Sequence, residues 1–162
     1  MPEAKIRVRP ATAEDRDLLL EWANEPDTRA AGFHRQPILP AEHDRWLAAQ
    51  LAHPELGRIW IGLVGTDPFG VVRVERSDEE DLLIVSISVD RSYRGRGLSE
   101  QLLGAGIAAA REAFPGLRLR AWVRADNSRS VRLFSALGFV PPPVRPPSPP
   151  GAPSDVLVLE RD

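Results

Sequence analysis

A short loop of arginines and glycines, residues 94–97, carries the clearest chemical signal in this chain. It follows an apolar run that ends at Val89 and precedes a proline-free segment that extends to Pro115. This order is typical of a strand, a tight loop and a helix. N–H groups in the first turn of a helix have no partner inside it, and glycine lets a ligand approach the backbone closely. The loop is therefore expected to bind an anion, with the helix dipole adding to the attraction. The alternative is a turn flanked by solvated arginines.

The spacing within this loop separates it from the two common phosphate motifs. Neither G-x-x-x-x-G-K-[ST] nor G-x-G-x-x-G fits, whereas [Q/R]-x-x-G-x-[G/A] does, through Arg94, Gly97 and Ser99. Between a strand and a helix, this pattern resembles the pyrophosphate loop of the GNAT superfamily, the acetyl-CoA-dependent N-acetyltransferases. Ser99 departs from the last position of the pattern but is still a small residue.

A second pattern that resembles the same superfamily, N-x-x-S-x-x-L-F-x-x-x-G-F, lies further along the chain. It consists of Asn127, Ser130, Leu133, Phe134, Gly138 and Phe139. In the family, this helix lies beside the pantetheine arm and the thiol of the cofactor. The same residues would also form the capped, buried face of an ordinary helix, and the two interpretations are compatible.

The composition excludes several classes of site. The chain has 162 residues, which fits a single domain over residues 1–162, and its net charge of -2 gives no general attraction to nucleic acid. It has no Cys, hence no thiol nucleophile, and its three His lack metal-ligand spacing. It has no signal-peptide core and no run of 18 apolar residues. We expect a cytoplasmic protein without a metal, a nucleic-acid partner or a membrane partner.

The hydrophobic pattern predicts an alternation of strands and helices. Strands are expected at residues 5–9, 58–64, 71–75, 82–89, 117–123 and 156–159. A further strand is expected to start at residues 139–140 and to be cut short. Helices are expected at residues 13–24, where Thr12 and Asp15 form a capping box, and at residues 41–52. Two more are expected between the arginine-glycine loop and Pro115, and from a cap at residues 126–127 to 137. Residues 28–39 are expected to form a loop or broken helix, and residues 65–70 a somewhat long hairpin turn.

This order of elements is that of the GNAT fold, an α/β (α+β) domain. The resemblance implies a mixed central sheet flanked by helices, with splayed parallel strands at its centre. Residues 141–153 contain eight of the sixteen prolines and are expected to form an extended connection to the last strand. Such a segment covers a sheet edge poorly, which leaves room for a homodimer.

The resemblance implies acetyl-CoA as the cofactor and assigns its contacts. They are Ile87, Ser88, Val89, Arg94, Gly95, Arg96, Gly97, Leu98, Ser99, Asn127, Ser130, Leu133 and Phe134. The pantetheine amides would extend the sheet beside Val89, whose N–H would polarise the thioester carbonyl. A substrate amine would then attack the acetyl carbon directly, without an acyl-enzyme.

The chain departs from its relatives at both positions where proton transfer is expected. Phe134 stands where many members carry a Tyr as general acid, and Ile84 stands where many carry a Glu as base. Only the hydroxyls of Ser86 and Ser88 follow, so the predicted catalytic set is Val89, Ser88 and Ser86. An amine with a pKa near roughly 8 fits such a site better than a lysine near roughly 10.4, because it is partly neutral at pH 7.

The N-terminal third suggests an acceptor. The pattern W-x-N-x-P-x-x-R, followed by H-x-x-W, is similar to GNAT enzymes that acetylate the 4-amino group of UDP-linked amino sugars in pseudaminic-acid biosynthesis. The substrate contacts implied are Asn24, Arg29, His43 and Trp46. A small-molecule amine, specifically a UDP-amino sugar, is therefore the expected acceptor. Two alternatives remain: a protein N-terminus or another small-molecule amine, and a CoA-binding module without catalysis.

Overall fold

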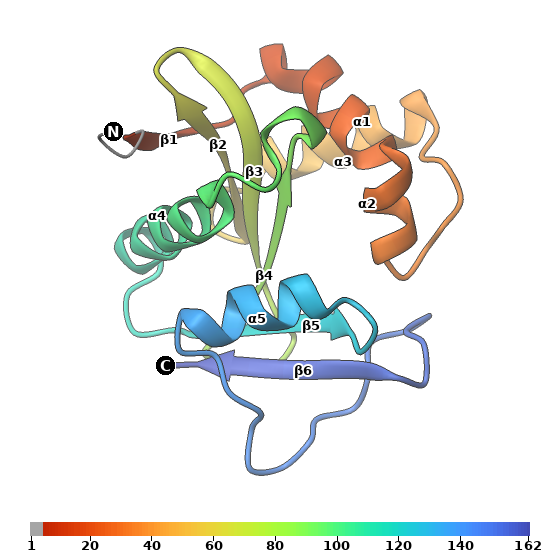
Figure 1. Cartoon of the computed structure of the whole chain (residues 1–162), viewed down its shortest axis with the longest axis vertical. Helices are drawn as coiled ribbons and strands as arrows, with labels where there is room; N and C mark the ends of the chain where they lie inside the picture. Colours follow the sequence, from red (N-terminus) through yellow and green to blue (C-terminus); the bar gives the residue numbers. More distant parts are fainter. Residues whose placement is uncertain (1–4) are drawn as a thin grey trace.

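The computed structural model describes residues 5–162, in which a six-stranded sheet has helices on both faces (Figure 1). The strands lie in sequence order across the sheet: β1 (Ile6–Pro10), β2 (Gly57–Val64), β3 (Asp67–Arg76), β4 (Leu82–Val89), β5 (Arg118–Arg124) and β6 (Val156–Arg161). Neighbouring strands are antiparallel except β4 and β5, which are parallel. A parallel pair needs a long crossover, and helix α4 (Leu98–Ala113) lies within it.

The other helices are shorter, and only η2 among them lies within the same crossover. They are η1 (Ala13–Asp15), α1 (Arg16–Asn24), α2 (Pro26–Ala31), α3 (Pro40–Ala52), η2 (Arg91–Tyr93) and α5 (Ser128–Ala136). None of the helices in residues 5–162 has the length and apolar character needed to cross a membrane.

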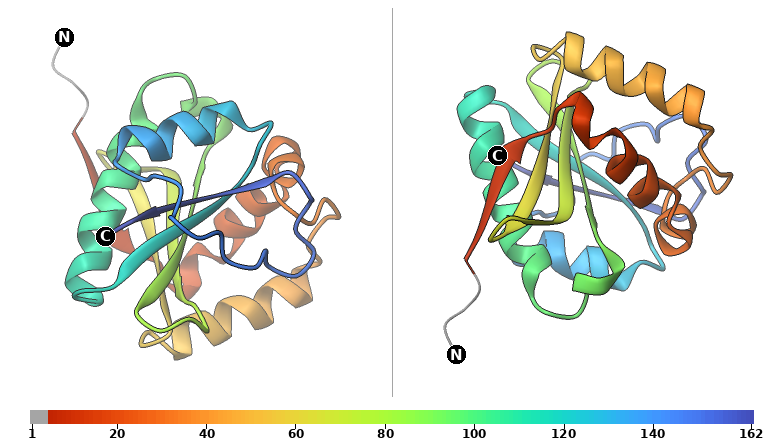
Figure 2. Two further views of the ribbon diagram at one scale, coloured as in Figure 1. Left: turned by 90° about the horizontal axis from the view of Figure 1, so that it is seen from below. Right: turned by 90° about the horizontal axis from the view of Figure 1, so that it is seen from above.

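Apolar side chains fill both faces of the sheet. On one face α4 and α5 pack against the central strands, and Val72, Leu102 and Leu103 are completely enclosed there. On the other face α1 and α3 pack against β2, with Leu19 and Leu47 in contact with the sheet. Figure 2 shows α4 and α1 on opposite sides of the sheet. The two layers hold the strand ends in place, and it is at these ends that the predicted site lies.

Helix α4 packs unusually close to strand β3. A Cβ added to Gly106 would lie 2.6 Å from Cγ1 of Val72, so a side chain at this position would force the helix away from the sheet. The absence of that side chain allows the helix to rest on the strand. The first turn of α4 is thereby fixed next to the end of β4.

The parallel strands β4 and β5 pair over only a short distance. The paired positions are Leu82 with Arg118, Leu83 with Leu119, and Ile84 with Arg120. Beyond them β4 continues to Val89 without pairing with β5, while β5 continues to pair with β6 as far as Arg124. The predicted splay between the central parallel strands is therefore confirmed.

Most of the predicted elements are present, and three differ in extent. The hairpin turn is short, because β3 begins at Asp67 and pairs across what was expected to be a six-residue turn. A helix, α2, forms where a loop or broken helix was expected, with Glu25 as its N-cap and Pro26 in its first turn. The start of a strand expected after Phe139 is a single bridge from Val140 to β6.

The proline-rich residues 141–153 form neither a strand nor a helix, as predicted. Arg145 fastens the segment to the sheet, because its Nη2 donates to the carbonyl oxygen of Val156 at 2.9 Å. Near its other end, Gly151 packs against His34 in the loop after α2, where an added Cβ would lie 2.7 Å from Cε1 of the ring. The segment therefore joins β6 to the loop between α2 and α3.

Candidate cofactor and acceptor site

The gap beside β4 exposes backbone groups of two predicted site residues. The Asp90 N–H donates to the Phe69 carbonyl at 2.7 Å, which makes this the hydrogen-bonded type of antiparallel pair. Hydrogen-bonded and non-hydrogen-bonded pairs alternate along an antiparallel ladder, so Val89 and Ile87 belong to non-hydrogen-bonded pairs with β3. Their N–H and C=O groups point away from β3 toward β5, where the ladder has already ended. The gap can therefore pair with an extended amide-containing chain.

The loop that follows β4 presents a row of N–H groups at the same end of the sheet. Gly95 and Gly97 adopt φ angles of +77° and +72°, which few other residues adopt without strain, and no atom lies near the position of a Cβ at either. Gly97 is the N-cap of α4 and has no side chain to satisfy the first turn. In the described part of the chain, no acceptor is recorded for the N–H groups of residues 95–99. They form a concave set of donors suited to an anion.

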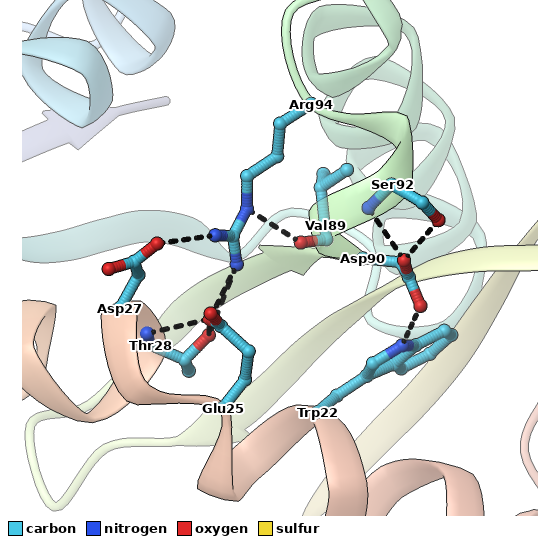
Figure 3. Close-up of polar contacts among 8 residues, drawn as sticks. All are labelled: Trp22, Glu25, Asp27, Thr28, Val89, Asp90, Ser92 and Arg94. Carbon is cyan, nitrogen blue, oxygen red and sulfur yellow. Dashed lines mark hydrogen bonds and ion pairs between the residues drawn. The ribbon is translucent and has the colours of Figure 1, made fainter.

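The side chains around this loop have mixed roles. Leu98 is buried in the core and anchors the start of α4, and Ser99 beside it is half-buried. Arg96 is exposed and its guanidinium carbon lies 5.4 Å from the ring centroid of Tyr93. The guanidinium of Arg94 turns instead toward α2, where it contacts Glu25 at 2.8 Å (Figure 3). The Arg94 N–H donates to the Arg91 carbonyl at 3.4 Å, so the row of open donors begins at Gly95.

Helix α5 begins where β5 ends, on the opposite side of the gap. Asn127 caps it, because its Oδ1 accepts the Ser130 N–H at 3.2 Å. Phe134 is buried and its ring meets that of Phe139 at 77° with centroids 5.0 Å apart, while Leu133 is half-buried against the same core. The capped-face interpretation of this pattern is confirmed, and the cofactor role of these residues stays a prediction.

Within the described part of the chain, no side chain beside Val89 is placed to act as a general base. Ser88 is half-buried and Ser86 is exposed, and both lie on the face of β4 opposite the α4 core. Asp90, next along the chain, accepts Trp22 Nε1 at 2.8 Å and the Ser92 N–H at 2.9 Å. Burial raises the pKa of Asp90, but these hydrogen bonds outweigh burial and the pKa lies below its ordinary value.

We call the face of the sheet that carries Arg73 and Ser86, opposite the α4 core, the acceptor face. Two arginines, Arg29 and Arg73, lie at this face, and the sequence pattern predicted a role only for Arg29. Arg73 of β3 lies directly opposite Ser86 on β4, and its guanidinium carbon lies 5.1 Å from the ring centroid of Trp46. Arg29 on α2 has a buried Nε with no partner among residues 5–162, and its Nη1 donates to the Gln36 carbonyl at 3.3 Å. Burial lowers the pKa of Arg29, and the nearby charge of Arg73 lowers it further. An anion between the two guanidinium groups would offset both the cost of burying Arg29 and its repulsion by Arg73.

The two other predicted substrate residues are placed differently from what was expected. His43 is only 3% exposed and lies 5.4 Å from Trp46 between ring centroids. Burial lowers its pKa, so the ring is neutral and lies behind Trp46 rather than facing a phosphate. Both amide atoms of Asn24 are bonded to the backbone of Ile38, at 2.7 and 2.9 Å. Asn24 therefore uses both of its polar atoms to hold the loop before α3, and its predicted contact with a substrate stays a prediction.

The chain belongs to the GNAT acetyltransferase family, because residues 5–140 match the family model for the acetyltransferase (GNAT) domain. It is also 29% identical over 168 residues to an uncharacterised protein of Mycobacterium leprae. That match covers 99% of this chain and 44% of the relative, so the chain spans less than half of the relative's length.

Solved structures of acetyltransferases have the same fold. Spermidine N-acetyltransferase from Vibrio cholerae, in complex with CoA and spermine, has a TM-score of 0.82 at 16% identity and covers 98% of this chain and 96% of its own. An N-acetyltransferase from Staphylococcus aureus has a TM-score of 0.79 at 22% identity, covering 98% of each chain. Ribosomal-protein-alanine N-acetyltransferase from Brucella melitensis has a TM-score of 0.77 at 22% identity, covering 95% of this chain and 98% of its own. At these identities the likeness shows the fold.

Proposed function

We propose that this chain is an N-acetyltransferase that moves the acetyl group of acetyl-CoA directly to a primary amine. The observation that carries the proposal is that a gap with unpaired strand amides and a row of free loop amides lie at the same end of β4. A diphosphate joined to an extended amide-containing arm fits this combination, and CoA has both parts. Acetyl-CoA supplies an activated acetyl group when it is bound.

The chain's own groups would perform the remaining steps. Donors at residues 95–99 bind the diphosphate, and the backbone of Ile87 and Val89 pairs with the arm. The Val89 N–H lies at the end of β4, well beyond its last pair with β5, and would stabilise charge that develops on the thioester oxygen. Ser86 and Ser88 can orient a water that accepts the amine proton, but neither hydroxyl is a strong base. The acceptor is therefore an amine that is already partly neutral at physiological pH.

For the acceptor, we propose the amino group of a nucleotide-linked amino sugar. The support lies on the acceptor face, where Arg29 and Arg73 offer two cationic groups and Trp46 offers a ring beside them. Guanidinium groups suit phosphate oxygens, and an aromatic ring suits a sugar or a base.

A protein N-terminus is the second candidate. Its α-amino group has the required low pKa, and the W-x-N opening of the chain also occurs in acetyltransferases of ribosomal-protein N-termini. An acidic N-terminal peptide would satisfy the two arginines as well as a diphosphate would. A protein that binds CoA without turnover is the third candidate, favoured by the absence of a side-chain acid and base near Val89.

One acceptor screen separates these candidates. The protein is incubated with acetyl-CoA and a UDP-4-amino sugar, an acidic N-terminal peptide or spermidine, and released CoA thiol is measured. Thiol release that is fastest with the UDP-linked sugar supports the proposal, and release with the peptide alone supports the second candidate. Melting curves provide the cofactor control: acetyl-CoA at ~100 times its Kd adds ~2.7 kcal/mol, or roughly 5–10 °C. An unchanged melting temperature would contradict all three.

A further inference from the structure

Arg94 is the first residue of the predicted cofactor loop, yet its side chain contacts the N-terminal helices (Figure 3). Nη2 donates to Glu25 Oε2 at 2.8 Å, and Nη1 donates to Asp27 Oδ2 at 3.3 Å. Nε donates to the carbonyl oxygen of Val89 at 3.0 Å. One guanidinium group therefore joins the end of β4 to the start of α2, over a sequence separation of 69 residues to Glu25.

Glu25 has a second role in this contact, because the same oxygen that binds Arg94 caps α2. Glu25 Oε2 accepts the Thr28 N–H and the Thr28 hydroxyl, each at 3.0 Å. Burial raises the pKa of Glu25, but the hydrogen bonds from Arg94 and Thr28 outweigh it and give a pKa of about 2. The carboxylate is therefore charged at neutral pH, and its bonds to Arg94 and to the helix cap form together.

The contact with Val89 determines which backbone group remains available in the gap. Both the N–H and the C=O of Val89 point toward β5, as the alternation of the antiparallel ladder requires. Arg94 occupies the C=O. The N–H is left as the open group, and a donor is what the thioester oxygen needs.

The contact of Arg94 with Glu25 holds helix α2, which borders the acceptor face. Helix α2 is only six residues long and has no fully buried side chain, so packing alone holds it weakly. It carries Arg29, whose buried Nε belongs to the proposed anion subsite. A contact that fastens α2 therefore also fixes the position of Arg29 relative to Val89.

We propose that Arg94 is a positioning residue for the acceptor amine: its ion pair with Glu25 holds α2 and Arg29 at a fixed place beside the end of β4. The proposal goes beyond acetyl transfer itself and rests on that function only for its kinetic readout. Loss of the Arg94 side chain should therefore make α2 more mobile and lower kcat/KM for the acceptor, while the cofactor keeps its main-chain contacts.

The test uses Arg94→Gln, Glu25→Gln and the double variant in the full chain. Glu25→Gln retains an oxygen that can cap α2, so it removes the charge and leaves the cap in place. Arg91→Gln is the matched control, because Arg91 is an exposed arginine near the same loop for which no side-chain contact is recorded. Three quantities are measured: amide hydrogen exchange of residues 27–31, the Kd of acetyl-CoA by calorimetry, and kcat and KM for the acceptor that the screen identifies.

With Arg94→Gln we expect exchange in α2 to accelerate at least about tenfold, and acceptor kcat/KM to fall about 10- to 100-fold. The Kd of acetyl-CoA should change by less than about threefold, because backbone donors bind the diphosphate. The double variant should be no worse than the single variants, since both remove one shared interaction. Arg91→Gln should behave as the unchanged protein.

Two results would overturn the proposal. A Kd of acetyl-CoA that rises tenfold or more while α2 exchange is unchanged would make Arg94 a direct cofactor ligand. Unchanged exchange together with unchanged kinetics would show that the ion pair holds nothing in place. The exchange measurement needs neither cofactor nor acceptor, so it decides on the ion pair even if the proposed acetyl transfer fails.

Discussion

Arg120 lies opposite Ile84 in the last pair of the parallel ladder between β4 and β5. The arginine is 6% exposed, and two carboxylates hold it: Glu160 on the neighbouring strand β6 at 2.6 Å and Glu79 before β4 at 2.9 Å. Beyond this pair β5 follows β6 and leaves β4. The buried ion pairs of Arg120 thus mark the position where the gap for the cofactor opens.

Arg120→Gln should destabilise the protein strongly, because Glu160 would keep a charge in a largely buried place without its main partner. We expect a loss of about 3 kcal/mol in the free energy of unfolding, measured by urea denaturation. Arg118→Gln is the matched control: Arg118 binds the same two carboxylates but is 38% exposed, and should cost less than about 1 kcal/mol. Equal losses in the two variants would show that burial of Arg120 is not what matters.

Gly97→Ala should weaken acetyl-CoA binding by about tenfold or more, as calorimetry would measure. Its φ of +72° is unfavourable for alanine, so the backbone donors of the loop would turn or strain. Gly116→Ala is the control, because Gly116 has a φ of +80°, equally open surroundings and a place far from the loop in the sequence. Both variants should lose about 1 kcal/mol of stability, but only Gly97→Ala should lose cofactor affinity. Equal cofactor affinities would argue against the loop as the diphosphate site.

The Arg9–Asp15 pair should make stability depend on pH in the acid range. Asp15 is buried, accepts both ends of the Arg9 guanidinium at 2.7 and 2.8 Å, and accepts the Thr12 N–H at 2.8 Å. The hydrogen bond from Arg9 is the main reason that the pKa of Asp15 lies below its ordinary value of 3.8. A lowered carboxyl pKa stabilises the fold above the unfolded pKa, and this stability is lost as the pH falls through the folded pKa.

Asp15→Asn should therefore cost about 2 kcal/mol at pH 7 and should flatten the decline of melting temperature below about pH 4. Melting curves of both proteins between pH 7 and pH 2.5 would show this. Asp17→Asn is the control, since Asp17 is an exposed carboxylate in the first turn of α1, two residues after Asp15, and makes a surface ion pair only. A variant whose melting temperature falls with pH as steeply as that of the original protein would contradict the prediction.

The anion subsite predicts a charge preference among acceptors. Arg73→Gln and Arg29→Gln should each lower kcat/KM for a UDP-linked 4-amino sugar by about 10- to 100-fold, because a charged hydrogen bond is lost. With the same sugar lacking UDP, both variants should react as the unaltered protein does. Arg132→Gln, on the exposed side of α5, should change neither value. An equal loss with both acceptors would point to a structural role for the two arginines.

The sequence predicted those elements whose hydrophobic pattern and capping residues lie within the element itself. The strand at residues 82–89 was predicted with the observed bounds, because apolar residues bounded by turn signals define it. The Thr12–Asp15 capping box also formed as expected. For residues 28–39 the sequence left a loop and a broken helix as alternatives, because α2 buries no side chain fully and so has no hydrophobic periodicity to detect.

The misjudged turn after β2 has a tertiary cause. Gly70 was interpreted as part of the turn, but it lies within β3, where an added Cβ would be 2.7 Å from both Leu102 and the Ser88 carbonyl. The glycine therefore serves the close packing of α4 on the sheet rather than a bend. The residues next to Gly70 in the sequence do not indicate its contact with Leu102.

The same limit applies to the site. The loop at residues 94–97 could be recognised because its donors come from consecutive residues. Arg73 could not, because its importance depends on Trp46 of α3 and Ser86 of β4 coming together around it. The destination of the Arg94 side chain depends likewise on Glu25, which is distant in the sequence. Side-chain partners that are set by the tertiary fold lie beyond what spacing can reveal.

A crystal structure of the protein with acetyl-CoA would test the central claim most directly. We predict diphosphate oxygens at about 3 Å from the N–H groups of residues 95–99, and the thioester oxygen at the Val89 N–H. The pantetheine arm should lie between β4 and β5 beyond Ile84. Density for the cofactor at another surface, or a diphosphate held only by arginine side chains, would contradict the account.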